Sequence, residues 1–556
     1  DQFNLYSKIY IEGTLKEIET NKSMIVSSFG DYLYKMGVNY EVRASHYNIV
    51  SNGDVVRPAI IKFLKLGLSE ESQKMVSLLF LGDKSLDLDF YNSISELGIT
   101  HLIVISGFHL NILYKFIKKI FKKSNDILIL CFLILYLYLL NFSIPVVRAF
   151  LFLLIKTICE KKKIKMNNIA TLLLIASSLL LVNYHNLFNL SYQLTFITNL
   201  VILLLSNSSF KGFIFDNFIR SLLIQLSIIP ILLSINYELN IISVFYIFIF
   251  TIPIIIMYIS SMITAIVKFS DLLFKSMCIA FKDFVKYVDK FKINLIFGKP
   301  SSLIIILYYF IFIMLLYFLI LKIKKKYLIY SFSLFFLLTF QYFKPYIFQK
   351  DEVIFLNVGQ GDSTLVVGRN LNYCFLIDTG GLEYRDVSND ITIPILKAKG
   401  IKKLNAIIIT HNDFDHNGAL DSMISNFNVD LVYDGWKERN INIKNCYIKN
   451  YNKYFTSNDD DNIKSAVLGF RNGNRNYLIM GDAPKEIEQK IINDNPSLGD
   501  LPSFILLIFF ILDNNPVIFC TLKSDKSNSA IICLELYGPL ESRSYIFPSM
   551  LSLAEV

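Results

Sequence analysis

Long apolar runs with few charged residues occupy the middle of the chain. Stretches without any charge cover residues 127–140 and 303–321, and further apolar spans lie near 168–183, 190–206, 218–234 and 241–267. A helix needs about 20 apolar residues to cross the hydrocarbon core of a bilayer. The pattern predicts a polytopic α-helical membrane domain with roughly seven to nine crossings.

Shorter periodic segments precede and interrupt these runs. Alternating residues at 9–15 and 40–44 predict two strands of a small β-rich segment over residues 1–54. The spacing of apolar residues between positions 55 and about 98 predicts two amphipathic helices. Residues 271–294 predict a Lys-rich amphipathic helix, which either lies in the membrane interface or forms a connector packed on the helical domain.

Prolines fall within several of the apolar spans. Pro145, Pro230 and Pro253 predict helix breaks, which membrane proteins tolerate where the backbone lines a cavity. The sequence therefore favours irregular helices around an internal path.

The pattern changes to that of a soluble α/β domain after Lys350. Turn residues separate short strand-like runs at 353–356, 364–367, 373–378, 406–409, 466–470 and 477–480. The last two runs flank Asn472-Gly473, a hairpin signal. We assign this domain to residues 346–490, and residues 491–556 form an atypical C-terminal tail in no recognisable order.

The composition adds a positive charge and little cysteine chemistry. The net charge is +9, which reflects either the positive bias of cytoplasmic loops or a polyanionic ligand. Basic runs at 115–123 and 161–163 flank a stretch that crosses twice, so both are expected on the cytoplasmic side. Seven cysteines are present without a CxxC pair, so neither a zinc ribbon nor a disulfide framework is indicated.

A candidate metal loop follows the apolar run 406–409. Thr410–His416 holds two of the chain's six histidines, and its potential ligands are His411, Asp413, Asp415 and His416. Asp482 ends a later strand and is expected to join them. Histidine and carboxylate ligands suit Zn²⁺ or Mn²⁺. We predict a divalent metal site with catalytic roles for Asp413, Asp415 and Asp482; the alternative is an acidic surface loop with two incidental histidines.

Two polar residues lie inside apolar spans. Placing the charged Arg148 side chain in the hydrocarbon core costs several kcal/mol unless it is paired or faces water. The uncharged polar side chain of Gln193 carries a smaller cost of the same kind. We expect Arg148 to face an aqueous path, although it could instead extend to the membrane interface.

Four segments of the membrane region carry a resemblance to a known family. They are Leu81-Gly82-Asp83, His101–His109, Pro145–Ala149 and Phe188–Phe196. In this order they resemble the competence domain of the ComEC family, which forms the inner-membrane channel for single-stranded DNA in natural transformation. The resemblance implies a multi-pass channel domain at 55–345 and a partial OB-like domain at 1–54 whose earlier part is missing. It implies a DNA path along His101, Ser106, Gly107, His109, Arg148 and Gln193.

The soluble domain resembles the metallo-β-lactamase fold (αββα) appended to ComEC proteins. Asn357–Ser363 and Thr410–His416 match two motifs of that domain. The resemblance implies one metal on His411 and Asp413 and a second on Asp415 and His416, bridged by Asp482. It also implies degradation of the strand that is not imported. However, no histidine follows His416, so the family's last histidine motif is absent and the site is expected to hold one ion, two weakly, or none.

The combined expectation is an inner-membrane channel for single-stranded DNA with a nuclease-like domain. No Gly-x-x-x-x-Gly-Lys-Ser/Thr loop occurs, so a cytoplasmic ATPase and a DNA-receptor protein are expected partners beside single-stranded DNA and membrane lipid. The alternatives are a membrane-anchored metallohydrolase of another phosphoester or lipid, and a degenerate relic.

Overall fold

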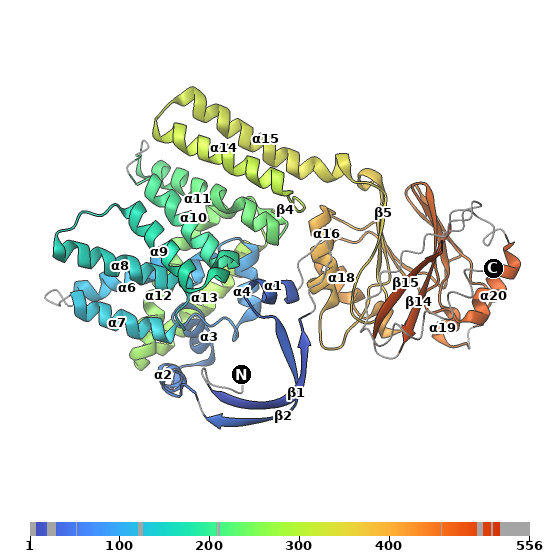
Figure 1. The fold of residues 1–556 in the computed structure, drawn as a ribbon, viewed down its shortest axis with the longest axis horizontal. Coiled ribbons are helices and arrows are strands. Elements are labelled where there is room, and N and C mark those ends of the chain that lie inside the picture. Colours follow the sequence, from blue (N-terminus) through green and yellow to red (C-terminus); the bar gives the residue numbers. More distant parts are fainter. Residues whose placement is uncertain are drawn as a thin grey trace. The chain divides into compact units, whose positions relative to one another are not determined.

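The computed structural model describes residues 7–18, 29–51, 53–120, 126–206, 208, 212–456, 459–496, 504–512 and 515–522. The chain divides into two compact units. One comprises residues 1–295 and 301–335, and the other comprises residues 296–300 and 336–556. The first unit is mainly helical and the second is built on β-sheets (Figure 1).

Helices form most of the first unit. They are α1 (Phe29–Lys35), α2 (Val56–Lys65), α3 (Glu70–Leu79), α4 (Leu88–Glu96), α5 (Thr100–Ile103), α6 (Gly107–Ile120), α7 (Asp126–Leu139), α8 (Ile144–Lys162), α9 (Asn168–Val182), η1 (Tyr184–Phe188), α10 (Leu190–Leu204), α11 (Phe213–Ile235), α12 (Ser243–Ile266), η2 (Lys268–Ser270), α13 (Asp271–Asp289), α14 (Ser302–Ile320) and α15 (Lys324–Phe348), whose last turns belong to the second unit.

The strands of the first unit are few. β1 (Lys8–Glu17) and β2 (Tyr40–Ser51) pair in antiparallel orientation, and β3 (Glu238–Asn240) and β4 (Asn294–Ile296) are short. β1 and β2 contain the two strands expected near the N-terminus, at 9–15 and 40–44.

Three described helices are long and apolar enough to cross a membrane. They are residues 215–235 of α11, α12 and α14, and shorter apolar helices cover 129–139, 168–182 and 190–204. By length and composition, the described part of the chain therefore supports fewer crossings than the seven to nine expected. After α7, Asn141 and Phe142 adopt positive φ angles of 51° and 50° and turn the chain where the apolar run 127–140 ends.

The proline expectation is wrong for two of the three sites. Pro230 lies inside α11 and Pro253 inside α12, and both helices continue past them. Pro145 stands at the start of α8, where its missing N–H would have no helical partner in any case.

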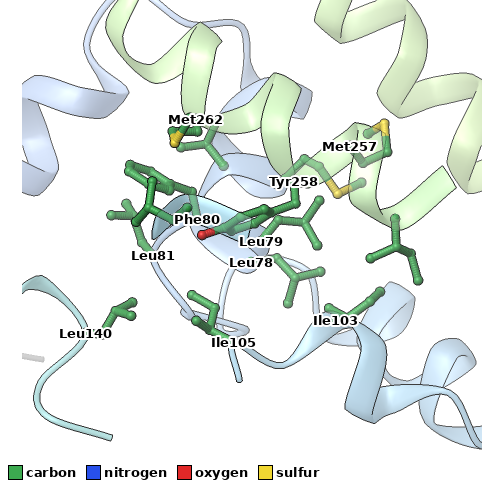
Figure 2. Packing of buried hydrophobic residues seen from close by; sticks show 14 of the residues in the cluster. Leu78, Leu79, Phe80, Leu81, Ile103, Ile105, Leu140, Met257, Tyr258 and Met262 are labelled. Carbon is green, nitrogen blue, oxygen red and sulfur yellow. The ribbon is translucent and has the colours of Figure 1, made fainter. Parts of the chain in front are cut away.

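The core of the first unit brings distant sequence segments together. Tyr136 of α7 donates a hydrogen bond to the Phe80 carbonyl (2.9 Å), and its hydroxyl lies 3.3 Å from that of Tyr258 on α12. Gly82 packs closely against Ile105, since a Cβ atom added to Gly82 would lie 3.3 Å from the Ile105 side chain. Figure 2 shows this packing of residues from α3, α5, α12 and the chain around them: Leu78, Leu79, Phe80, Leu81, Ile103, Ile105, Leu140, Met257, Tyr258 and Met262. The segments around 81–83 and 101–109 are therefore neighbours.

The amphipathic helix α13 packs on this core. Its apolar face is buried through Phe274, Cys278, Phe281, Val285 and Val288. α13 packs against α3, α4 and α12. This arrangement fits the interpretation of the helix as a packed connector.

Two sheets form the second unit. The first has the order β5 (Glu352–Phe355), β6 (Thr364–Val367), β7 (Cys374–Ile377), β8 (Ala406–Ile409) and β9 (Val432–Asp434). β5 to β7 are antiparallel, whereas β7, β8 and β9 are parallel. The second sheet has the order β10 (Asn440–Ile443), β11 (Cys446–Asn450), β12 (Leu468–Asn472), β13 (Arg475–Ile479), β14 (Phe504–Leu512) and β15 (Asn515–Leu522).

The two sheets share one apolar core, and helices cover them. Phe375 and Ile408 of the first sheet pack with Phe470 of the second. On the outer side of the second sheet, Leu478 packs against Ile487 of α20. The helices and turns are η3 (Arg369–Leu371), η4 (Ser388–Thr392), α16 (Ile393–Lys399), α17 (Phe414–Asn417), α18 (Leu420–Asn426), α19 (Asp461–Lys464) and α20 (Lys485–Asp494). This is the expected αββα arrangement.

The chain beyond residue 490 contributes strands. β14 pairs in parallel with β13, after the crossover through α20, and β15 pairs in antiparallel orientation with β14. The rest of the expected tail, residues 497–503, 513–514 and 523–556, lies outside the described residues.

Candidate metal centre

Strand ends position the candidate metal ligands. β8 ends at Ile409, and the next residues, Thr410 and His411, begin the loop. The single turn α17 then carries His416 back over the sheet, and Asp482 follows β13. The Gly481 between β13 and Asp482 has a φ of 52°, and a Cβ there would lie 2.3 Å from the Ser465 hydroxyl. A side chain at 481 would therefore strain the loop that presents Asp482.

Three ligand-type side chains converge. His411 and His416 are each 1% exposed, and their ring centroids are 4.1 Å apart. Nε2 of His416 lies 3.2 Å from an Asp482 oxygen, and Nε2 of His411 lies 4.0 Å from the other. One ligand atom from each of these three residues falls within 4.8 Å of the other two. The geometry provides two imidazoles and a carboxylate at one point.

A buried carboxylate, Asp378, orients both histidines. It follows β7, and its Oδ2 lies 3.0 Å from Nδ1 of His416. The same oxygen accepts a hydrogen bond from the Thr410 hydroxyl (2.7 Å), which in turn lies 3.0 Å from Nδ1 of His411. Because the Thr410 proton is donated to Asp378, its oxygen is left to accept from His411. Both histidines therefore have Nδ1 held by Asp378 or Thr410 and turn Nε2 toward Asp482.

The donor set fits a divalent metal ion. Nε2 of His411 is buried and has no hydrogen-bond partner among the described residues. A buried, unsatisfied ring nitrogen costs free energy, and a metal ion is the ligand that would remove this cost. Two imidazole nitrogens with a carboxylate are a typical environment for Zn²⁺ or Mn²⁺.

Asp413 and Asp415 differ in their relation to this cluster. An Asp413 oxygen lies 3.5 Å from Nε2 of His411, which puts Asp413 at the edge of the site. Asp415 is outside the group of three ligands found among the described residues. Its backbone is held close to Gly361, where an added Cβ would lie 1.7 Å from the Asp415 carbonyl oxygen. The structure therefore brings together His411, His416 and Asp482, with Asp413 nearby.

The electrostatics of the cluster reflect its acidic surroundings. Burial lowers the pKa of His416, but hydrogen bonds to Asp378 and Asp482 outweigh it and raise the pKa to about 11. Burial, with the charge of His416, lowers the pKa of His411. Burial also raises the pKa of Asp362 to about 7, with the neighbouring carboxylates acting in the same direction. A site of this charge favours a cation.

Sequence reasoning missed two carboxylates of this site. Asp378 was assigned to the end of a strand, although it orients both histidines. Its position after β7, which is parallel to β8, is the signal that could have identified it, because carboxyl ends of parallel strands meet at one edge. Asp362 lies in the quoted motif 357–363 but received no role.

The residues expected along the DNA path occupy different environments. Ser106 and His109 interact at the start of α6, where the Ser106 N–H donates to Nδ1 of His109 (3.3 Å). Arg148 is 6% exposed, and its guanidinium lies against Gly107. His101 is exposed on α5, and the Gln193 amide donates to the Leu187 carbonyl at 2.8 Å. The contacts of the described residues gather Ser106, Gly107, His109 and Arg148, but not His101 or Gln193.

Comparisons with known proteins match both parts of the chain. Residues 79–322 match the family model described as "Competence protein", and residues 356–435 match the "Metallo-beta-lactamase superfamily". The chain is 27% identical to "ComE operon protein 3" of Bacillus subtilis (strain 168), over 88% of this chain and 71% of that protein. It is 26% identical to "Competence protein ComA" of Neisseria gonorrhoeae, over 27% of this chain and 22% of that protein. It is 28% identical to "Uncharacterized protein MG316" of Mycoplasma genitalium, over 39% of this chain and 58% of that protein.

Proposed function

The chain is a membrane protein that joins a competence domain to a metallo-beta-lactamase domain, and from this organisation we propose that it carries single-stranded DNA through the inner membrane into the cytoplasm. The observation that carries the proposal is the competence-family match over residues 79–322. This range includes both the core motif around Ser106 and Gly107 and the buried Arg148 on α8. The likeness to two competence proteins supports a role in DNA uptake.

The proposed path uses the cluster at the start of α6. Passage of a polyanion through an apolar region requires cations that offset the phosphate charge. Arg148 is such a cation, and Gly107 leaves the space in which its guanidinium lies. His101 and Gln193 belong to the same proposal through the family resemblance, at positions farther along the path.

We propose that the second unit cleaves phosphodiester bonds in the strand that is not imported. The observation that favours this second function is the convergence of His411, His416 and Asp482 around the unpartnered Nε2 of His411. His411 and His416 would hold a divalent ion with Asp482, and Asp413 would complete the ligand set. When bound, such an ion would activate water near neutral pH and polarise a phosphoryl oxygen. Asp378 and Thr410 orient both rings so that Nε2 of each faces Asp482.

The proposal also includes a set of partners. Single-stranded DNA is the cargo, and membrane lipid surrounds the apolar helices. No nucleotide-binding loop of the Walker type occurs in the sequence, so a cytoplasmic ATPase is proposed to drive transport. A DNA-receptor protein is proposed to deliver the strand.

Uptake of labelled donor DNA separates the two activities. We expect Arg148→Ala to reduce transformation at least tenfold while membrane insertion is retained, because the path loses its buried cation. The double variant His411→Ala with Asp482→Ala should retain uptake but lose degradation of the other strand. Lys156→Ala, an exposed position on the same helix α8, is the matched control.

Two outcomes contradict the proposal. Normal transformation by the Arg148 variant, at equal protein levels in the membrane, would exclude the path through Arg148. Loss of all uptake in the double metal-site variant would favour a membrane-anchored hydrolase whose helices serve only as an anchor.

A further inference from the structure

Arg148 is buried without a counter-charge. Its side chain is on the first turns of α8 and is 6% exposed, and Nε has no hydrogen-bond partner among the described residues. No ion pair of Arg148 occurs there either. An arginine keeps its charge in proteins, so burial alone is strongly unfavourable. The described residues therefore leave one positive charge uncompensated.

The guanidinium lies at the positive end of a second helix. Gly107 is the first residue of α6, and a Cβ on Gly107 would be only 2.4 Å from Nη2 of Arg148. α6 has 14 residues, and the Leu110 N–H is bonded to the Ser106 carbonyl at 3.2 Å. The Gly107 N–H precedes this bond and has no acceptor within the helix. This N–H and the helix dipole place additional positive potential beside Arg148.

Two positive groups at one buried point favour an anion. We propose that the N-terminus of α6 and Arg148 together bind a phosphodiester group of single-stranded DNA. Backbone N–H groups at a helix N-terminus bind phosphate, and a guanidinium binds two phosphate oxygens at once. The inference rests on the proposed function, since it identifies the part of the transported strand that this site recognises.

Two packed helices hold the site. α6 and α8 pack against each other, and Gly107 and Arg148 both lie near the N-terminal ends of these helices. The C-terminal turns of the same helices carry Lys118 with Lys119 and Lys161 with Lys162. In each helix the contact between Gly107 and Arg148 and the basic turn therefore lie at opposite ends.

The glycine in the motif is explained by the same contact. Gly107 does not have a positive φ, so its backbone conformation accepts any residue. Alanine in the first turn of a helix ordinarily stabilises it relative to glycine. A Cβ at position 107 would enter the space of the guanidinium and lie 3.1 Å from the Ala149 Cβ, so it would displace the guanidinium. Gly107 is therefore a positioning residue for Arg148.

Equilibrium binding of a fluorescent 12-nucleotide oligo-dT to the purified full chain in detergent tests the site. Arg148→Gln should weaken binding at least tenfold and reduce the slope of log K against log salt by about 0.7, the value for one contact to a single strand. Arg148→Lys should restore part of the affinity. Gly107→Ala should weaken the binding of oligo-dT although the arginine is kept. Because Gly107 acts through Arg148, the double variant Gly107→Ala with Arg148→Ala should bind oligo-dT no more weakly than Arg148→Ala alone. Lys156→Gln is the control, expected within twofold of the parent.

Each alternative outcome contradicts a defined part of the proposal. Unchanged affinity and salt slope in Arg148→Gln, in a parent that supports uptake, would overturn this site and leave the proposed function intact. A parent that neither binds oligo-dT nor supports uptake would overturn both. Phosphatidylglycerol vesicles and inorganic phosphate serve as competitors. If either displaces oligo-dT from the parent at a phosphate concentration below that of the oligonucleotide, and does not do so with Arg148→Gln, the site binds lipid or free phosphate and not DNA. If Arg148→Gln fails to fold, the affinities of Arg148→Lys and Gly107→Ala for oligo-dT test the proposal instead. An affinity of Gly107→Ala equal to that of the parent would overturn the proposed site.

Discussion

The hydroxyl group of Thr410 connects the two histidines of the metal centre. It donates to Asp378 and accepts from His411, while Asp378 also holds His416. Its backbone N–H donates to the other Asp378 oxygen at 2.7 Å. The ring orientation on both sides of the site thus depends on a residue that does not itself face the metal position. Outer residues of this kind change metal affinity by about 10–100-fold in known sites.

Replacement of Thr410 tests this role. Thr410→Val keeps the shape but removes the hydroxyl, so Asp378 loses a donor and Nδ1 of His411 loses its acceptor. We expect a loss of Zn²⁺ affinity of about tenfold or more, measured by competition with a chromogenic chelator. Thr410→Ser keeps the hydroxyl and should bind like the parent, and Asp421→Asn is an exposed control. Equal affinity of the Val and Ser variants would exclude the relay.

At this scale the sequence indicated three of the clustered side chains, His411, His416 and Asp482, but not the groups that orient them. The spacing of His411 and His416 after a strand indicated a metal loop, because those side chains bind metals by their own chemistry. Asp378 lies 32 residues from Thr410 in the sequence. Its role depends on the parallel pairing of β7 and β8, which a pattern within one segment does not encode.

The helix α13 shows what an element-level pattern predicts and what it omits. The sequence indicated an amphipathic helix, and Phe274, Phe281 and Val285 are buried as expected. Three other apolar side chains of the same pattern, Leu272, Ile279 and Phe284, are exposed. The pattern did not identify the polar partners. Nζ of Lys282 lies 2.5 Å from both a Glu71 oxygen and an Asp87 oxygen, which joins α13 to α3 and to the start of α4. These contacts connect residues about 200 positions apart, so periodicity within α13 could not reveal them.

Removal of the Lys282 ammonium should destabilise the helical unit. Lys282→Met leaves Asp87 without its ion pair and weakens the contacts of Glu71, which costs about 2 kcal/mol for charged hydrogen bonds. The midpoint of thermal unfolding in detergent should fall accordingly. Lys275→Met, an exposed position on the same helix, should have little effect. An equal shift in the two variants would mean that the ion pairs do not stabilise the fold.

The predictions of strands and helices were also correct for some elements and incomplete for others. The six strands predicted in the second unit, β5 to β8, β12 and β13, begin and end within two residues of the predicted runs, whereas β9, β10, β11, β14 and β15 were not predicted. The Asn472-Gly473 signal marks a real hairpin, although its two-residue turn is Gly473 and Asn474. Among the described residues, three helices are long and apolar enough to cross a membrane and three shorter apolar helices accompany them, so the prediction of seven to nine crossings stays a prediction.

At the scale of the whole molecule, the chain consists of two compact units with different chemistry. One contains the apolar helices, and the other contains the candidate metal centre, whose residues follow strands of both sheets. A ligand that binds only the folded form stabilises the unit that contains its site. Metal should therefore act on one unit and leave the other unchanged.

Calorimetry of the full chain with and without chelator tests this separation. We expect two unfolding transitions, of which only one moves when EDTA removes the metal. Free metal 100-fold above Kd contributes about 2.7 kcal/mol, equivalent to about 5–10 °C for a unit of this size. His416→Ala should show the lower midpoint with or without EDTA. A chelator that moves both transitions equally, or neither, would contradict metal binding confined to the second unit.

The parallel pairing of β14 with β13 has a consequence for protein engineering. The crossover through α20 returns the chain in the same direction, so β14 runs toward the edge of the sheet that carries Asp482. Ile479, the last residue of β13, is paired with Leu507, and the chain then turns through Gly481 to Asp482. A designer who wished to add a ligand to the three-residue cluster would therefore choose the backbone of β14 that follows Leu507. The topology identifies that location without any knowledge of the side chains that now occupy it.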